Sequence, residues 1–141
     1  MLSVRQTPVL WFNLMSNFLE QALARYEEGR VLLDSGDIAG AITSLEASIA
    51  HSPHFKTLEL LGEAYLRVGE PSRAIVPLAA ATTLNAQVRG PSLLAEALLA
   101  SGERLKAHEI AKLALDREPS NKRARAVFNA TNDEFTAWSS Q

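Results

Sequence analysis

Apolar and polar residues alternate along most of this chain with the spacing of an α-helix. In the segment 37–51, Ile38, Ile42, Leu45 and Ile49 recur at intervals of three or four residues, so they fall on one side of a helix. The same periodicity predicts six helices grouped in pairs, over residues 21–35 and 37–51, 55–68 and 71–84, and 92–101 and 103–117.

Small residues repeat along the same region with a constant step of 33 residues. The repeating positions are Gly29, Gly62 and Ala95; Gly36, Gly69 and Gly102; Ala41, Ala74 and Ala107; and Ser48, Ala81 and Ala114. We expect the second set to end helices, because glycine adopts the left-handed C′ conformation without steric cost. The other small residues allow the two helices of a pair to approach closely. The sequence therefore predicts three tandem helical hairpins.

A further helix is predicted after the third hairpin, over residues 121–138. Its apolar stripe recurs every three or four residues and comprises Ala124, Val127, Phe128, Thr131, Phe135 and Trp138. The opposite side is rich in charged and amide residues. Such an amphipathic helix can cover the open end of a repeat array and expose its polar side to water.

The N-terminal segment is unusually apolar. Thr7 and Pro8 are typical of a helix start, and Trp11, Met15 and Phe18 then fall on one face, with Phe12 beside it. This predicts either one continuous helix over residues 8–35 or a short helix that breaks near residues 16–17. The apolar face needs a partner, and three alternatives stay open: packing on the first repeat of the same chain, a homodimer interface, or binding of another protein.

The repeat pattern resembles the tetratricopeptide-repeat (TPR) family, whose unit is a helix-turn-helix of 34 residues. The segments 61–65 (Leu-Gly-Glu-Ala-Tyr) and 36–42 (Gly-Asp-Ile-Ala-Gly-Ala-Ile) carry the resemblance most clearly. It implies an all-α fold and a single-domain α-solenoid: an N-terminal helical extension (1–21), three TPR-like helical hairpins (22–54, 55–87 and 88–120) and a C-terminal capping helix (121–138). Pro91 departs from the family pattern, and we expect it to delay the third hairpin's first helix until Ser92.

The resemblance also implies a role in binding proteins or peptides, as an adaptor, a scaffold or a chaperone-like protein. Members of this family bind partners on an inner wall lined by the first helix of each hairpin. The wall positions of this sequence are Tyr26, Arg30, Leu33, Glu59, Leu60, Glu63, Arg67, Arg89, Leu93 and Glu96. Their leucines predict an apolar groove for an amphipathic helix or an extended apolar peptide.

One branch of the family grips the C-terminal carboxylate of chaperone peptides with Lys, Asn and Arg side chains. The corresponding positions here hold Tyr26, Arg30, Leu60, Arg89 and Leu93. Only Arg89 matches, so the sequence argues against that specificity. The alternative function is structural: an oligomerisation unit in which Trp11, Phe12, Met15 and Phe18 form the interface between two copies.

Composition narrows the function classes further. The net charge of −2 gives no general attraction to nucleic acid or to an anionic membrane. The chain has no cysteine, and His51 and His54 flank a turn without the converging ligands that a metal ion needs. There is no glycine-rich phosphate loop and no nucleophile motif. We therefore expect a cytoplasmic, non-enzymatic protein without cofactor, metal ion or membrane insertion.

Overall fold

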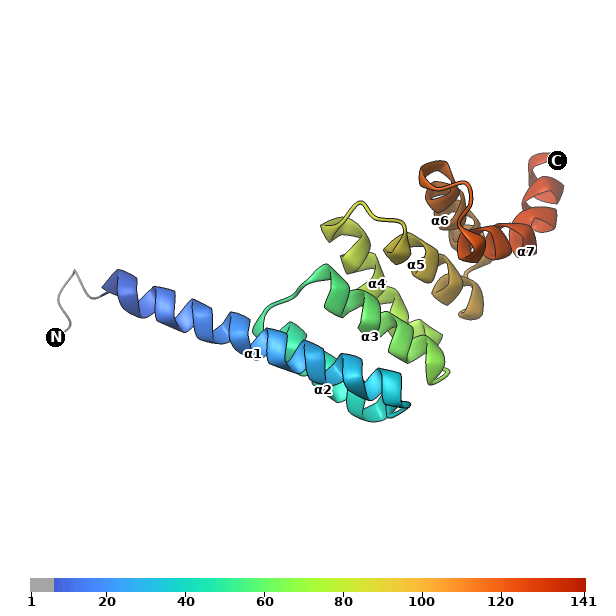
Figure 1. The fold of residues 1–141 in the computed structure, drawn as a ribbon. Helices are drawn as coiled ribbons and strands as arrows, with labels where there is room; N and C mark the ends of the chain where they lie inside the picture. The colour runs from blue at the N-terminus through green and yellow to red at the C-terminus, as the bar shows by residue number, and fades with distance from the viewer. Residues whose placement is uncertain (1–6) are drawn as a thin grey trace.

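In the part of the chain that the structure describes, seven α-helices follow one another and pack in sequential order (Figure 1). The computed structural model describes residues 7–141, except the side chains of Thr7, Glu134, Phe135, Ala137, Trp138 and Ser139. The helices are α1 (Thr7–Ser35), α2 (Ile38–His51), α3 (Phe55–Arg67), α4 (Pro71–Leu84), α5 (Arg89–Ala100), α6 (Arg104–Arg117) and α7 (Lys122–Ser139). The predicted hairpins are confirmed as α1–α2, α3–α4 and α5–α6, and α7 packs on α5 and α6.

Glycine ends the first helix of each hairpin, as the sequence predicts. Gly36, Gly69 and Gly102 have φ values of 90°, 82° and 83°, in the left-handed region. In the second hairpin the backbone N–H of Glu70 donates to the carbonyl of Tyr65 at 2.9 Å, which is the long hydrogen bond of a Schellman turn. These turns reverse the chain within two or three residues and place the second helix alongside the first.

Each hairpin closes around a contact between a small residue and a large one. A Cβ atom added to Gly29 would lie 2.7 Å from Cγ of Leu45, and one added to Gly62 would lie 2.3 Å from Cγ of Leu78. Both leucines are fully buried. The equivalent positions of the third hairpin hold Ala95 and Ala111, which are also fully buried. Compared with the first two hairpins, the third has alanine in place of glycine on its first helix and alanine in place of leucine on its second.

The prediction for the start of α5 is wrong. The helix begins at Arg89 rather than at Ser92, so Pro91 lies within its first turn. The backbone N–H groups of a first turn have no acceptor inside the helix, and a proline there therefore costs no hydrogen bond.

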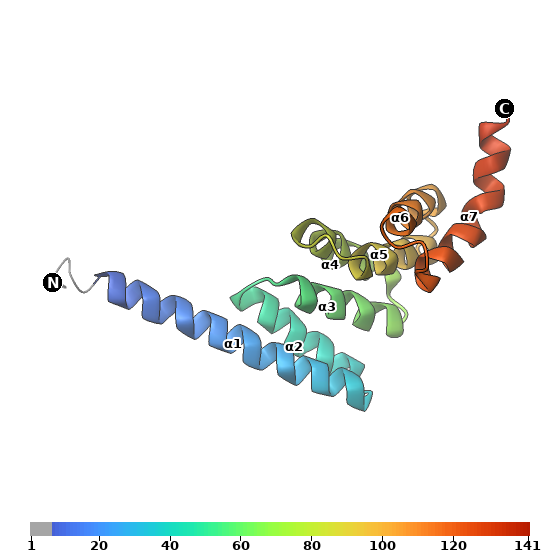
Figure 2. The ribbon, with the colours of Figure 1, turned by 45° about the horizontal axis from the view of Figure 1, so that its top comes forward.

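The N-terminal segment forms one continuous helix with the first hairpin, without a break near residues 16–17. Helix α1 has 29 residues and α2 has 14, so α1 extends well beyond the end of its partner (Figure 2). Near the end of α2, Ser48 Oγ donates to the carbonyl of Ala22 at 2.6 Å, and the ring of His51 lies 6.2 Å from that of Phe18. The part of α1 before Phe18 is called the overhang below.

Helix α7 covers the other end of the array. Ala124, Val127 and Thr131 are buried against the third hairpin. Thr131 Oγ1 lies 2.9 Å from Nδ1 of the buried His108 on α6, whose ring stacks on Phe128. The predicted stripe is therefore observed as far as Thr131, and Phe135 and Trp138 lie outside the described side chains.

Glu59 joins the second hairpin to the third. Its side chain is only 5% exposed and lies at the start of α5, whose N-cap residue Val88 provides no side-chain hydrogen bond. The backbone N–H of Gly90 instead lies near the Glu59 carboxylate and favours its charged form. Burial raises the pKa of Glu59 above its usual value, although nearby Arg89 and the Gly90 N–H both favour the charged form.

The packing of the second hairpin can be tested with a double-mutant cycle. Gly62→Ala forces a methyl group against Leu78 and should lower the free energy of unfolding by about 1–3 kcal/mol. Leu78→Ala alone leaves a cavity and should cost about 2–5 kcal/mol. The double variant reproduces the alanine pair of the third hairpin. We therefore expect its loss of unfolding free energy to be smaller, by at least about 1 kcal/mol, than the sum of the losses of the two single variants. Urea denaturation followed by circular dichroism measures all four proteins, and strict additivity would contradict this packing.

The raised pKa of Glu59 predicts a particular pH dependence of stability. The folded chain binds this proton more tightly than the unfolded chain does. The stabilisation from Glu59 is therefore fully present below the unfolded-state pKa and is lost as the pH rises through the folded-state pKa. We compare wild type with Glu59→Gln, which keeps an acceptor for Gly90. The unfolding free energy of wild type minus that of the variant should decrease from about pH 4 to about pH 7.

The exposed Glu20→Gln, measured in the same way, provides the control for removing a carboxylate from this chain. A wild-type advantage over Glu59→Gln that grew with pH would show that the ion pair with Arg89 outweighs burial.

Candidate functional site

The first helices of the three hairpins and the closing helix form one continuous surface, which we call the A-helix face. Helices α1, α3, α5 and α7 lie in this order along the array, and consecutive members contact each other. Three hollows open along them, with volumes of about 440, 660 and 490 Å³. A segment of another molecule laid across this face would contact successive repeats.

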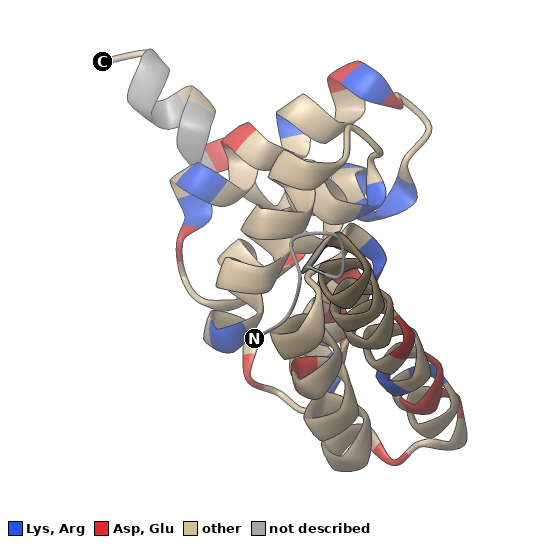
Figure 3. Ribbon diagram, turned by 90° about the vertical axis from the view of Figure 1, so that its left-hand side faces the viewer, with Lys and Arg blue, Asp and Glu red and all other residues tan. Residues whose placement is uncertain are grey.

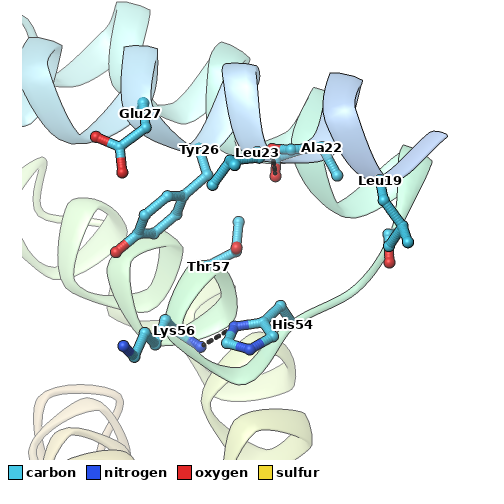
Figure 4. Close-up of a pocket in the computed structure, with 10 residues that line it drawn as sticks. Leu19, Ala22, Leu23, Tyr26, Glu27, His54, Lys56 and Thr57 are labelled. Atoms are coloured by element: carbon cyan, nitrogen blue, oxygen red, sulfur yellow. Dashed lines mark hydrogen bonds between the residues drawn. The ribbon is translucent and has the colours of Figure 1, made fainter. Parts of the chain in front are cut away.

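The N-terminal hollow, of about 440 Å³, lies between α1 and the start of α3. Leu23 and Tyr26 project from α1 toward the first turn of α3, where Lys56 and Thr57 form the opposite side (Figure 4). The complete lining comprises Leu19, Ala22, Leu23, Tyr26, Glu27, Ser48, Ser52, His54, Lys56 and Thr57. The hollow is thus apolar on the α1 side and polar on the α3 side.

Local hydrogen bonds hold the polar side of this hollow in place. Nδ1 of His54 accepts the backbone N–H of Lys56 at 3.2 Å and thereby caps the N-terminus of α3. The histidine therefore has a structural partner, and the ammonium group of Lys56 lies at the edge of the hollow (Figure 4).

The middle of the A-helix face is a network of paired charges. Arg89 forms an ion pair with Glu63, and its Nε lies 3.6 Å from Oε2 of the buried Glu59. Glu63 also accepts a hydrogen bond from Arg67 at 2.7 Å. Farther along, Arg123 of α7 forms an ion pair with Glu96 of α5. Most of the charge on this part of the wall is therefore neutralised by neighbouring side chains.

The other two hollows lie at the C-terminal end of the face and are more basic. The larger one is lined by Arg89, Arg117, Lys122 and Arg123, together with Glu118 and several neutral residues. The smaller one lies between α5 and α7, beside Glu96, Leu99 and Val127. Arg117 also donates to the carbonyl of Ala86 at 3.1 Å, which joins the two turns that border the larger hollow.

The structure corrects the predicted apolar groove. Leu33 and Leu93 are 4% and 1% exposed and belong to the core, so a ligand cannot reach them. Leu60 is half-buried and packs on the same core. The sequence pattern did not separate these leucines from wall residues, because a first helix carries one apolar side toward its own hairpin and another toward the groove. In the N-terminal hollow the apolar lining comes chiefly from Leu19, Leu23 and Tyr26.

The remaining predicted wall residues are polar. Arg30 is exposed and forms ion pairs with Glu27 at 2.9 Å and Asp34 at 3.7 Å on its own helix. Tyr26 lines the N-terminal hollow. Glu63, Arg67, Arg89 and Glu96 form the charge network, and Glu59 is buried in a structural role.

The family resemblance also places Lys56 and Lys122 along the wall, although not in the predicted groove, and they share a repeat position with Arg89. Lys56, Arg89 and Lys122 are separated by the 33-residue step, so one repeat position is basic in α3, α5 and α7. In the structure each of the three borders a hollow of the A-helix face. A search for repeated charge, in addition to repeated small residues, would have found this row.

The overhang does not pack on its own repeats. Trp11, Phe12 and Met15 are 62%, 71% and 61% exposed, and Phe18 is 43% exposed. The alternative in which Trp11, Phe12 and Met15 cap the first repeat of the same chain is therefore not observed, whereas Phe18 lies beside His51 of α2. None of the described helices is long and apolar enough to cross a membrane. Among the described residues, no three His, Asp or Glu side chains come together as a metal-binding group.

Comparison with known proteins identifies the fold. No family model and no curated protein matches the sequence. Among solved structures, the first TPR domain of Spaghetti (RPAP3), determined with an HSP90 peptide, is 20% identical with a TM-score of 0.78, covering 84% of this chain and 95% of that one. The C-terminal TPR-containing domain of an FK506-binding protein from Plasmodium falciparum is 15% identical with a TM-score of 0.80, covering 90% and 96%.

A third similar structure is YrrB, a TPR protein with an unusual peptide-binding site. It is 18% identical with a TM-score of 0.75, and the match covers 82% of this chain and 60% of that one. Together with the repeat geometry, these likenesses show that the chain has the tetratricopeptide-repeat fold, with three helical hairpins and a closing helix.

Proposed function

We propose that this chain is a protein-interaction module that holds a segment of another protein along its A-helix face. The observation that carries the proposal is the N-terminal hollow, which combines an apolar side formed by Leu19, Leu23 and Tyr26 with a polar edge at Lys56. A hollow of about 440 Å³ accommodates one or two large apolar side chains of a peptide. The paired charges beyond it suit the polar remainder of the segment.

The comparisons support a binding role without defining its partner. The first TPR domain of Spaghetti binds the HSP90 peptide SRMEEVD, and the second TPR domain of human RPAP3 forms a complex with the HSP70 peptide SGPTIEEVD. Both peptides are acidic and end in an aspartate.

The charges of this chain favour a different mode of recognition. Arg89, the one basic residue that matches the carboxylate-gripping pattern, is already paired with Glu63 and Glu59. A terminal carboxylate would have to displace these partners, at a cost in lost ion pairs. We therefore propose that an apolar anchor in the N-terminal hollow provides most of the affinity, and that the ligand's terminal carboxylate contributes little.

Selection from a random peptide library displayed on phage provides a ligand for the test. Leu23→Asp places a charge in the apolar side of the hollow, and Leu105→Asp places the same charge at an exposed leucine of α6. The two side chains are 61% and 58% exposed, so both variants should fold normally. Because burying one large apolar side chain is worth about 1.5–3 kcal/mol, Leu23→Asp should weaken the selected peptides by about tenfold or more.

Isothermal titration calorimetry measures the dissociation constants, and circular dichroism verifies the fold of each variant. Leu105→Asp should bind like wild type, and amidation of the peptide's C-terminus should change its affinity less than about threefold. Equal binding to wild type and Leu23→Asp would place the site elsewhere. A large loss on amidation would favour carboxylate capture.

A further inference from the structure

More than half of the large apolar side chains that are exposed in the described structure lie on the overhang and the two residues after it. These eight side chains, between Val9 and Leu19, are each 43–71% exposed. They are Val9, Leu10, Trp11, Phe12, Leu14, Met15, Phe18 and Leu19. Soluble monomers rarely leave a continuous apolar patch larger than a few hundred Å² in contact with water.

The direction of the patch indicates what can cover it. At 100° per residue, Trp11, Met15 and Phe18 lie on the same side of α1 as Gly29 and Leu33, which farther along face α2. Gly29 lies against Leu45 of α2, and α2 ends at His51, beside Phe18. The overhang therefore continues the surface on which α2 packs, beyond the point where α2 ends (Figure 2). The missing element is a helix antiparallel to α1 and in line with α2.

The charge of the overhang favours a second copy of this chain as the source of that helix. From Thr7 to Leu19 the sequence contains no Asp, Glu, Lys or Arg. In Figure 3 the end of α1 nearest the viewer is accordingly without charged residues. Two such helices can pair without repulsion between like charges, and a charged partner would find no opposite charge to pair with.

We propose that two copies of this chain form a dimer in which their overhangs pair as antiparallel helices. The overhang of about 11 residues is about 16 Å long at 1.5 Å per residue. Each overhang then occupies the space beside the other overhang that lies beyond the end of α2. Because the two overhangs have the same length, neither collides with the partner's α2. The two-fold axis then lies between residues 12 and 13, and Trp11, Leu14, Met15 and Phe18 form the contact.

The area of the contact corresponds to a weak, reversible dimer. The eight exposed side chains leave on the order of 800 Å² of apolar surface per copy, since large apolar and aromatic side chains each offer roughly 150–250 Å². The four contact side chains carry about half of it, so covering them in both copies buries roughly 800 Å², the size of weak, reversible interfaces. We therefore expect a dimer with a micromolar dissociation constant. It does not depend on the proposed peptide site, because Met15 does not line the N-terminal hollow.

Sedimentation equilibrium of the full chain, from about 1 µM to about 200 µM, tests the dimer. Met15→Asp places a charge in the interface, and Val31→Asp places the same charge on the opposite side of α1. The two side chains are 61% and 57% exposed, so neither change disturbs the core. Wild type and Val31→Asp should be dimeric at the upper concentrations, and the dissociation constant of Met15→Asp should rise at least about 30-fold. Monomeric wild type, or a Met15→Asp dimer of unchanged affinity, would overturn the proposal.

The antiparallel arrangement has its own test, because the chain contains no cysteine and accepts a single spin label. Asn13→Cys and Gln21→Cys place labels at exposed positions near to the proposed two-fold axis and far from it. In the antiparallel dimer the two copies of residue 21 are offset along the helix by about 25 Å, whereas the two copies of residue 13 are nearly level. Electron double resonance should therefore give a clearly longer distance for position 21. Equal distances at both positions would indicate a parallel pair and overturn the antiparallel arrangement.

Discussion

The close approach of the two helices within each hairpin is the constraint on which the rest of the structure depends. Leu45 and Leu78 can reach their buried positions only because Gly29 and Gly62 have no side chain. With the helices at this distance, the small residues at the other repeated positions of the second helices also become buried. The third hairpin has Ala95 and Ala111 at these positions, both fully buried, so a methyl group on the first helix is found where the facing side chain is shorter than leucine.

The fold could be predicted from the sequence because its determinants are local and repeated. Glycines that end helices and small residues that bring helices together recur at a fixed step, so each repeat supports the interpretation of the others. The start of α5 was missed because Pro91 was expected to precede the helix, whereas the first turn of a helix tolerates proline. The continuity of α1 could not be decided from residues 16–17, which are polar but compatible with a helix.

The wall of the candidate site was less predictable, for a different reason. Leu33 and Leu93 have the same residue type and helical spacing as Leu23, yet the first two are buried in the core and the third lies open beside a hollow. Leu23 and Leu33 lie about 80° apart around the axis of the same helix, and which of these two directions faces α2 depends on how α1 is oriented in the hairpin. Similarly, the charges at Glu59, Glu63 and Arg89 are identifiable in the sequence, but their pairing across two hairpins is not.

The N-terminal hollow lies across a joint in the array. Its apolar side belongs to α1, and its polar side belongs to the turn before α3 and to α3 itself. In a linear array each hairpin is held chiefly by its neighbours, so the first hairpin can separate from the second at a smaller cost than complete unfolding. A ligand side chain bound in this hollow would contact both sides of the joint, and its binding would stabilise the contact between the two hairpins. The free energy needed to separate the first hairpin from the second would thus rise with the occupancy of the hollow.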